Sequence, residues 1–265
     1  MGPAPGGSLI AAVLAGVGDE PSNVVEWFTD RAARSTAGAI GDHMWLTVWH
    51  SAVALLVVVA IGVPIATLLA HRGRGELVAA FAVSIGRAIP TVAVVGMLVI
   101  VSLRNGLGFD PWPIVIALVL LGLPPVFANA YTAVRSVDPG PVDAARAMGS
   151  TEWQVLTRVE LPLALPVIVA GVRTAAVQII ATEPLGAFFG GEGLGAYLRQ
   201  GLSAQDSYQV QAGALLVTAV AVGAEIVLVA AARVLLPHGV RMATPRRRAR
   251  RRVDPVLDAA PIAPT

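Results

Sequence analysis

The chain has 265 residues, of which 55% are hydrophobic and 14% charged, and its formal net charge is +2. Together with a mean hydropathy of +0.72, this composition departs from that of soluble globular proteins and predicts an integral membrane protein. The absence of Cys excludes disulfides and thiolate chemistry, and all nineteen basic residues are Arg, so no phosphate-binding loop with its lysine is present. Any ATP hydrolysis must therefore belong to another chain.

Residues 1–44 form the first predicted segment, which we expect to be extracytoplasmic or interfacial. Its apolar run from Leu9 to Val17 is shorter than the ~20 residues that a membrane-spanning helix needs. Residues 23–34 place Trp27 and Phe28 near one side of a helix and acidic and basic side chains near the other. This pattern predicts an amphipathic helix lying in the membrane interface.

Five apolar stretches then follow within residues 45–237, and together they predict an all-α transmembrane domain. The expected spans are residues 48–70, 77–103, 113–134, 163–182 and 210–236. Trp45 and Trp49 stand where interfacial aromatic side chains are common, and Pro64 and Pro90 are expected inside the first two spans. The Gly-rich connection 183–209 is expected to have irregular backbone shielded from lipid.

A polar segment, residues 138–162, separates the third span from the fourth and reads as two short helices joined by a glycine. Asp138 can cap the first helix, and Gly149 can adopt positive φ at its end. Ser150 or Thr151 can cap a second helix that runs through Arg158. Leu161, Pro162 and Pro166 are then expected to lead the chain into the next span.

The spacing within this segment is Asp143-Ala144-Ala145, three residues, Gly149, nine residues, Val159, one residue, Leu161-Pro162. It resembles the EAA loop of the permease subunits of binding-protein-dependent ABC importers, with Asp in place of Glu and Val in place of Ile. The resemblance implies the five-helix core of the type I permeases of the methionine-importer kind, and a cytoplasmic loop that inserts into a groove of an ATPase subunit. The residues it assigns to that contact are Asp143, Ala144, Ala145, Arg146, Met148, Gly149, Val159, Leu161 and Pro162. An ordinary amphipathic hairpin between spans is the alternative.

From about residue 45 to 236 the chain is similar to the osmoprotectant branch of these permeases. The similarity is carried by Arg87–Thr91, Leu161–Pro166, Ala170–Ala175 and Gly190–Gly195. Glu183 and Glu192 depart from the family pattern. The resemblance implies a translocation path that includes Arg87, Pro90, Arg173, Thr174, Glu183, Gly190, Gly191, Gly193 and Gly195.

Charged residues within the apolar stretches should face the protein interior, a water-filled cavity or an interface, because a charge in lipid is costly. Glu183 precedes Pro184 and is a candidate to face a cationic substrate, whereas Arg87 and Arg173 alternatively extend toward a membrane surface. An ion pair between Arg173 and Glu183 is not expected along one helix, since ten residues span roughly 15 Å. The glycine run is not expected to bind phosphate, because no βαβ pattern surrounds it.

Arginine residues are more frequent in the connections on one side of the predicted spans. By the positive-inside rule, the N-terminus should lie outside and residues 138–162 and the C-terminus in the cytoplasm, in the cell membrane of a bacterium. The Arg-rich tail within residues 238–265 should attract anionic lipid. A nucleic-acid patch is the alternative for the tail, but we expect no nucleic-acid partner.

The resemblance implies half of the translocation pathway for glycine betaine, choline or carnitine, with no enzymatic activity, metal or cofactor in this chain. ATP and Mg²⁺ would be bound by a separate ATPase, the substrate delivered by an extracytoplasmic binding protein, and the pore completed by an identical or homologous permease subunit. Two alternatives stay open. One is a permease for an amino acid such as methionine, and the other is a secondary transporter with Glu183 or Glu225 as a proton or sodium site.

Overall fold

The computed structural model describes residues 24–29, 40–78, 90–108 and 111–235, and their regular secondary structure is helical. The α-helices are α2 (Val24–Thr29), α4 (Ile40–His71), α6 (Thr91–Arg104), α7 (Trp112–Arg135), α8 (Pro139–Ala147), α9 (Glu152–Val155), α10 (Leu161–Thr182), α11 (Gly195–Ala204) and α12 (Ser207–Leu235). A π-helical turn, η1 (Leu156–Glu160), joins α9 to α10, and a 3-10 helix, η2 (Glu183–Phe189), follows α10. The predicted all-α fold is confirmed.

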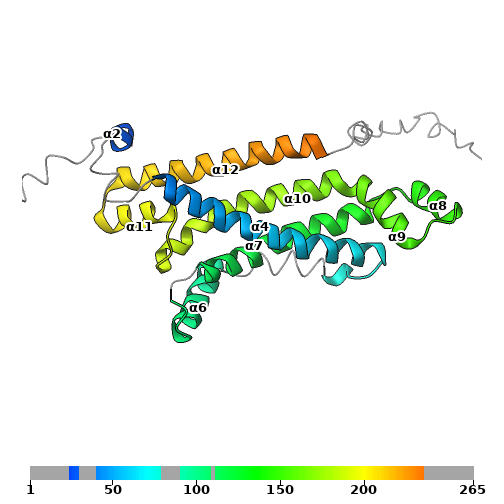
Figure 1. Cartoon of the computed structure of the whole chain (residues 1–265), viewed down its shortest axis with the longest axis horizontal. Helices are drawn as coiled ribbons and strands as arrows, with labels where there is room; N and C mark the ends of the chain where they lie inside the picture. The colour runs from blue at the N-terminus through cyan, green and yellow to red at the C-terminus, as the bar shows by residue number, and fades with distance from the viewer. Residues whose placement is uncertain (1–23, 30–39, 79–89, 109–110, 236–265) are drawn as a thin grey trace, which may run out of the picture.

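The centre of the fold is a bundle in which α7 packs against α4 and α10, while α12 packs against α10 and α11 (Figure 1). Small residues make these contacts, among them the fully buried Ala54 and Ala175. A side chain at Gly122 of α7 would meet Ile179 of α10 at 2.7 Å. Helices in lipid associate through close packing at small residues, because the burial of apolar surface contributes little free energy there.

The outside of the bundle is apolar along the long helices. Leu56, Leu215 and Ile226 are more than half exposed, and the helices long and apolar enough to cross a membrane are Ile40–His71, Trp112–Arg135, Glu152–Phe189 and Ser207–Arg233. The described part of the chain is thus a multi-pass membrane protein. The expected second span is described at residues 77–78 and 90–103, and residues 79–89, with Arg87, lie outside the described residues.

Pro90, which we expected inside the second span, does not lie within the helix α6 but directly before it. Pro90 has extended backbone with ψ 106°, and α6 begins at the next residue. Its carbonyl accepts the first N–H groups of α6, those of Ala93 and Val94. A proline at this position withholds no donor from the helix, whereas inside a helix it would remove a hydrogen bond.

The N-terminal helix α2 packs an aromatic side chain against the protein, and its position in the membrane interface stays a prediction. Trp27 of α2 is fully buried and packs edge-to-face on Tyr197 of α11, with ring centres 5.5 Å apart. Residues 30–34 of the expected helix are outside the described part. The first long helix, α4, already begins at Ile40, within the segment assigned to residues 1–44.

The Gly-rich connection is more ordered than expected, because it contains η2 and α11. Gly190, with φ 91°, ends η2. The carboxylate of Asp206 accepts the N–H groups of Tyr208 and Gln209, which starts α12 three residues before the predicted span. This Asp is a capping signal that the sequence interpretation overlooked.

Candidate functional site

The polar hairpin, residues 138–162, projects at one end of the bundle (Figure 1). Asp138 caps α8 by accepting the N–H of Gly140 at 2.9 Å. Gly149 follows with φ 84°, and the N–H of Ser150 returns to the carbonyl of Ala145 at 3.1 Å. The Asp138 cap at the start of α8 and the positive φ of Gly149 are confirmed as predicted. The positive φ of Gly149 ends α8 with a glycine C-cap.

Thr151, and not Ser150, caps the second helix. Its hydroxyl accepts the N–H of Gln154 at 3.3 Å, and the Gln154 side chain accepts the N–H of Thr151 at 2.9 Å. This reciprocal capping box fixes the direction in which α9 leaves the turn.

The predicted end of the second helix before Leu161-Pro162 is wrong, because α9, η1 and α10 run on without a break. The N–H of Leu161 bonds to the carbonyl of Leu156, five residues earlier. This wider π turn accommodates Pro162, which has no N–H to offer and needs space for its ring. The hairpin is therefore rigidly continuous with the membrane-spanning helix α10.

The predicted contact residues divide between an inner and an outer face of the hairpin. Ala145 packs inside with Val142 and Val155, and Val159 lies partly buried against them. Leu161 and Pro162 are also partly buried, while Asp143, Ala144, Arg146, Met148 and Gly149 are exposed. Met148 is 81% exposed and Trp153, which the sequence interpretation did not select, is 65% exposed. Two large apolar side chains thus stand open on this surface.

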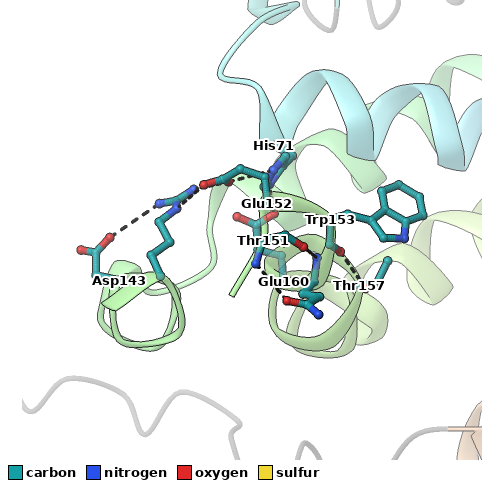
Figure 2. A network of polar contacts seen from close by, with 9 residues as sticks. His71, Asp143, Thr151, Glu152, Trp153, Thr157 and Glu160 are labelled. Carbon is teal, nitrogen blue, oxygen red and sulfur yellow. Dashed lines mark hydrogen bonds and ion pairs between the residues drawn. The ribbon is translucent and has the colours of Figure 1, made fainter. Parts of the chain in front are cut away.

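A chain of polar contacts ties the hairpin to the end of α4 (Figure 2). Arg146 donates two hydrogen bonds to Glu152, each 3.0 Å, and this carboxylate raises the pKa of the Arg146 guanidinium. His71 lies 3.2 Å from Glu152 through Nε2 and 2.7 Å from Glu160 through Nδ1. The sequence interpretation missed His71 and Glu160, since nothing local relates two residues 89 positions apart.

Glu183 lies toward the opposite end of the bundle, at the start of η2, and is only 2% exposed. Its Oε1 is 3.0 Å from Nδ1 of His50 on α4, while Oε2 has no hydrogen-bond partner among the described residues. The two residues line a cavity of about 250 Å³ together with Phe189, Gly190 and Gly191. This buried pairing leaves the predicted role of Glu183 toward a cation untested.

The remaining candidate glycines pack around that carboxylate. A Cβ at residue 193 would lie 3.0 Å from Oε1 of Glu183, and one at residue 195 would lie 2.2 Å from the carbonyl oxygen of Pro184. Next to them, the N–H of Leu194 donates to the hydroxyl of Thr47 at 2.9 Å. These glycines are required for close packing, and the structure places them away from Arg173.

Arg173 of α10 pairs with Glu225 of α12, through bonds from Nε (3.1 Å) and Nη2 to the same oxygen. Both side chains remain about one-third exposed. Thr174 beside them is exposed and donates its hydroxyl hydrogen to the carbonyl of Ala170. The predicted path residues therefore fall into two groups, one around Glu183 and the other around Arg173, and Pro90 lies exposed at the start of α6.

This arrangement of apolar helices, with a polar hairpin at one end, is that of a multi-pass membrane protein. A family model described as "Binding-protein-dependent transport system inner membrane component" matches residues 60–242, and the chain belongs to that family. It is a permease subunit of an ABC importer, and membership implies an ATPase and a substrate-binding protein as partners.

Similar proteins of known name come from several bacteria. The chain is 35% identical to the osmoprotectant import permease protein OsmW of Salmonella typhimurium, over 76% of this chain and 91% of the relative. It is 36% identical to the choline transport system permease protein OpuBD of Bacillus subtilis, over 71% and 81%. It is 34% identical to the carnitine transport permease protein OpuCD of Listeria monocytogenes, over 74% and 86%.

Among solved structures, a chain of the inward-facing MetNI methionine ABC transporter is similar to this one. The TM-score is 0.63 at 21% sequence identity, over 72% of this chain and 93% of the other. At this identity the likeness concerns the fold alone. It confirms the predicted type of permease fold.

Proposed function

We infer that this chain forms half of the translocation pathway for a small quaternary ammonium osmoprotectant, such as glycine betaine, choline or carnitine. The similar proteins named for osmoprotectant, choline and carnitine transport support this substrate class. The methionine alternative has less support, because it depends on a structural likeness at 21% identity.

The polar hairpin is the proposed contact with the ATPase, and the observation that carries this proposal is its rigid attachment to two spans. It continues into α10 through η1, and His71 ties it to α4 through two carboxylates. The exposed Met148 and Trp153 offer apolar side chains to a groove. When two ATPase subunits close on ATP and Mg²⁺, the hairpin would move as a lever and displace both spans.

The proposed orientation is supported by the charges around the hairpin. Arg72 and Arg74 follow the end of α4, and Arg135 is the last residue of α7, near the hairpin. Gly73 is close to the guanidinium of Arg135. The positive-inside rule therefore favours a cytoplasmic hairpin and an N-terminus outside. A second permease subunit and an extracytoplasmic binding protein complete the proposed importer.

The proposed function is tested by uptake of radiolabelled glycine betaine, choline and carnitine in a strain lacking this gene. We expect loss of uptake of at least one of the three, restored by the wild-type gene, with methionine uptake unchanged. Proteoliposomes holding the complete importer should transport only with ATP and a hydrolysis-competent ATPase. Unchanged uptake of all three compounds would overturn the substrate class, and ATP-independent uptake driven by an ion gradient would favour the secondary transporter.

A further inference from the structure

Arg173 and Glu225 form a charged pair within two helices whose surroundings are apolar. Arg173 is twelve residues into α10, or about 18 Å along the helix axis, which places it well inside a span. Its side chain is 35% exposed and that of Glu225 is 34% exposed. Charges at this depth do not face lipid, so this surface of α10 and α12 faces water or protein.

The pair borders two adjoining grooves. One groove of about 530 Å³ contains both charges together with the polar side chains of Thr174 and Gln178. The other, about 620 Å³, shares Glu225 and is lined by apolar side chains that include Val222 and Phe188. The two grooves share Glu225, so the Arg173 guanidinium lies in one and the apolar wall in the other; together we call them the Arg173–Glu225 groove.

We propose that the Arg173–Glu225 groove is a transient binding site for a zwitterion that carries a carboxylate and a quaternary ammonium group. The proposal rests on the proposed function and narrows its substrate class to glycine betaine and carnitine in preference to choline. Arg173 takes the substrate carboxylate in a charge-assisted pair. Glu225 faces the ammonium group, whose methyl groups contact the apolar wall, with Phe188 as an aromatic neighbour for the cation.

Arg173 and Glu225 neutralise each other's charge by pairing. A zwitterion replaces this one pair by two pairs and leaves no charge without a partner. Choline has no carboxylate, so it separates Arg173 from Glu225, and the guanidinium loses a charge-assisted pair that nothing replaces. The groove thus favours zwitterionic quaternary ammonium compounds over choline, because only the zwitterions carry a carboxylate.

The test is direct binding to the purified permease–ATPase complex without the binding protein, because delivery by that protein would impose its own selectivity. Saturation-transfer NMR with glycine betaine and choline measures the two dissociation constants. We expect glycine betaine to bind at least tenfold more tightly than choline. Arg173→Gln should weaken glycine betaine at least tenfold without weakening choline, whereas Glu225→Gln should weaken choline more than glycine betaine.

Two further variants separate binding from folding. The double variant Arg173→Gln/Glu225→Gln leaves no unpaired charge, so it should remain folded and lose the preference for glycine betaine. Arg104→Gln changes an exposed arginine at the end of α6 and should bind as the wild type does. Equal effects of Arg173→Gln on the two compounds would overturn the proposal, as would a double variant that keeps the preference. The proposal would also be overturned if these variants lost the contact between permease subunits but kept the binding preference. The Arg173–Glu225 pair would then belong to a subunit interface.

The uptake experiment tests the proposed function and the binding experiment tests the Arg173–Glu225 groove, so that either hypothesis can be rejected without the other. Normal osmoprotectant uptake with no binding difference between the variants would remove the groove and leave the proposed function. Absence of osmoprotectant uptake, together with the reciprocal shifts in binding, would remove the proposed function and leave a zwitterion site.

Discussion

The two ends of the helix bundle are stabilised in different ways. At the polar hairpin, apart from the pairs that His71 makes, caps and ion pairs join residues close in the sequence, such as Thr151 with Gln154 and Arg146 with Glu152. At the Gly-rich end, the polar contacts join distant segments, since His50 and Glu183 are 133 positions apart and Thr47 and Leu194 are 147 apart. The hairpin contacts are mostly exposed, whereas those of the Gly-rich end are buried.

Because of this difference, the loss of a polar contact should lower the free energy of unfolding less at the hairpin than at the Gly-rich end. Exposed ion pairs exchange with water, so each contributes little to stability. Buried polar groups have no water to replace a lost partner, so removal of one partner is costly. Substitutions at the Gly-rich end should therefore destabilise the fold, while substitutions at the hairpin should leave its stability unchanged and disturb the contact with the ATPase.

The largest effect is expected for His50→Leu, which leaves the buried Glu183 without a hydrogen-bond partner among the described residues. Breaking such a pair from one side costs about 3–5 kcal/mol. The double variant His50→Leu/Glu183→Met should recover most of that loss, because it replaces both polar groups by apolar ones. Thermal unfolding of the purified protein in detergent measures both variants. Additive losses in the double variant would mean that the two side chains do not stabilise each other.

Gly195→Ala should have the next largest effect, because its Cβ would lie 2.2 Å from the Pro184 carbonyl oxygen. The backbone of η2 or α11 must then shift, which we expect to cost about 1–3 kcal/mol. Gly223→Ala is the matched control, since a Cβ there meets nothing within 4 Å. In the middle of α12 it should be neutral or stabilising by up to about 1 kcal/mol. Equal unfolding temperatures for the two variants would contradict close packing at Gly195.

The same contrast explains how much could be predicted from the sequence. Asp138 and Gly149 were identified correctly because a helix cap and a left-handed turn depend on a few neighbouring residues. The apolar composition was sufficient for an all-α membrane fold. The positions of helix starts were less accurate, since the Asp206 cap moves the start of α12 and Pro90 lies before α6 instead of within it.

The pairings between helices could not be predicted from the sequence. Arg173 and Glu225 are 52 positions apart, and which faces of α10 and α12 meet depends on the packing of many small residues. Glu183 was selected as a polar residue in the membrane, but its partner on α4 follows only from the bundle. The π turn before Pro162 was missed for a similar reason, because the sequence permits either a break or a widened turn.

Gly149→Val tests whether a substitution at the hairpin impairs coupling to the ATPase without impairing folding. Valine opposes the positive φ of residue 149, at a local cost of about 1–3 kcal/mol. The variant should insert in the membrane normally but lose copurification with the ATPase or substrate-stimulated ATP hydrolysis. Gly149→Asn is the control, because Asn tolerates the left-handed region better, and it should retain both. Wild-type assembly and coupling in Gly149→Val would show that the hairpin is a passive connection.

The smallest effect is expected for Asp143→Ala. Asp143 is 72% exposed at its side chain and lies 3.6 Å from Arg146, so its removal takes away a weak, solvent-screened pair without straining the backbone. Arg146→Gln should have a larger effect on binding to the ATPase, because Arg146 also donates two hydrogen bonds to Glu152 and so holds α8 against α9. Neither variant should change the unfolding temperature of the bundle, since both residues lie outside its core. Pull-down with a range of ATPase concentrations ranks the two variants against Gly149→Val. If Asp143→Ala weakened binding more than Arg146→Gln, the carboxylate itself would contact the ATPase, and the hairpin would act through its charge as well as its shape.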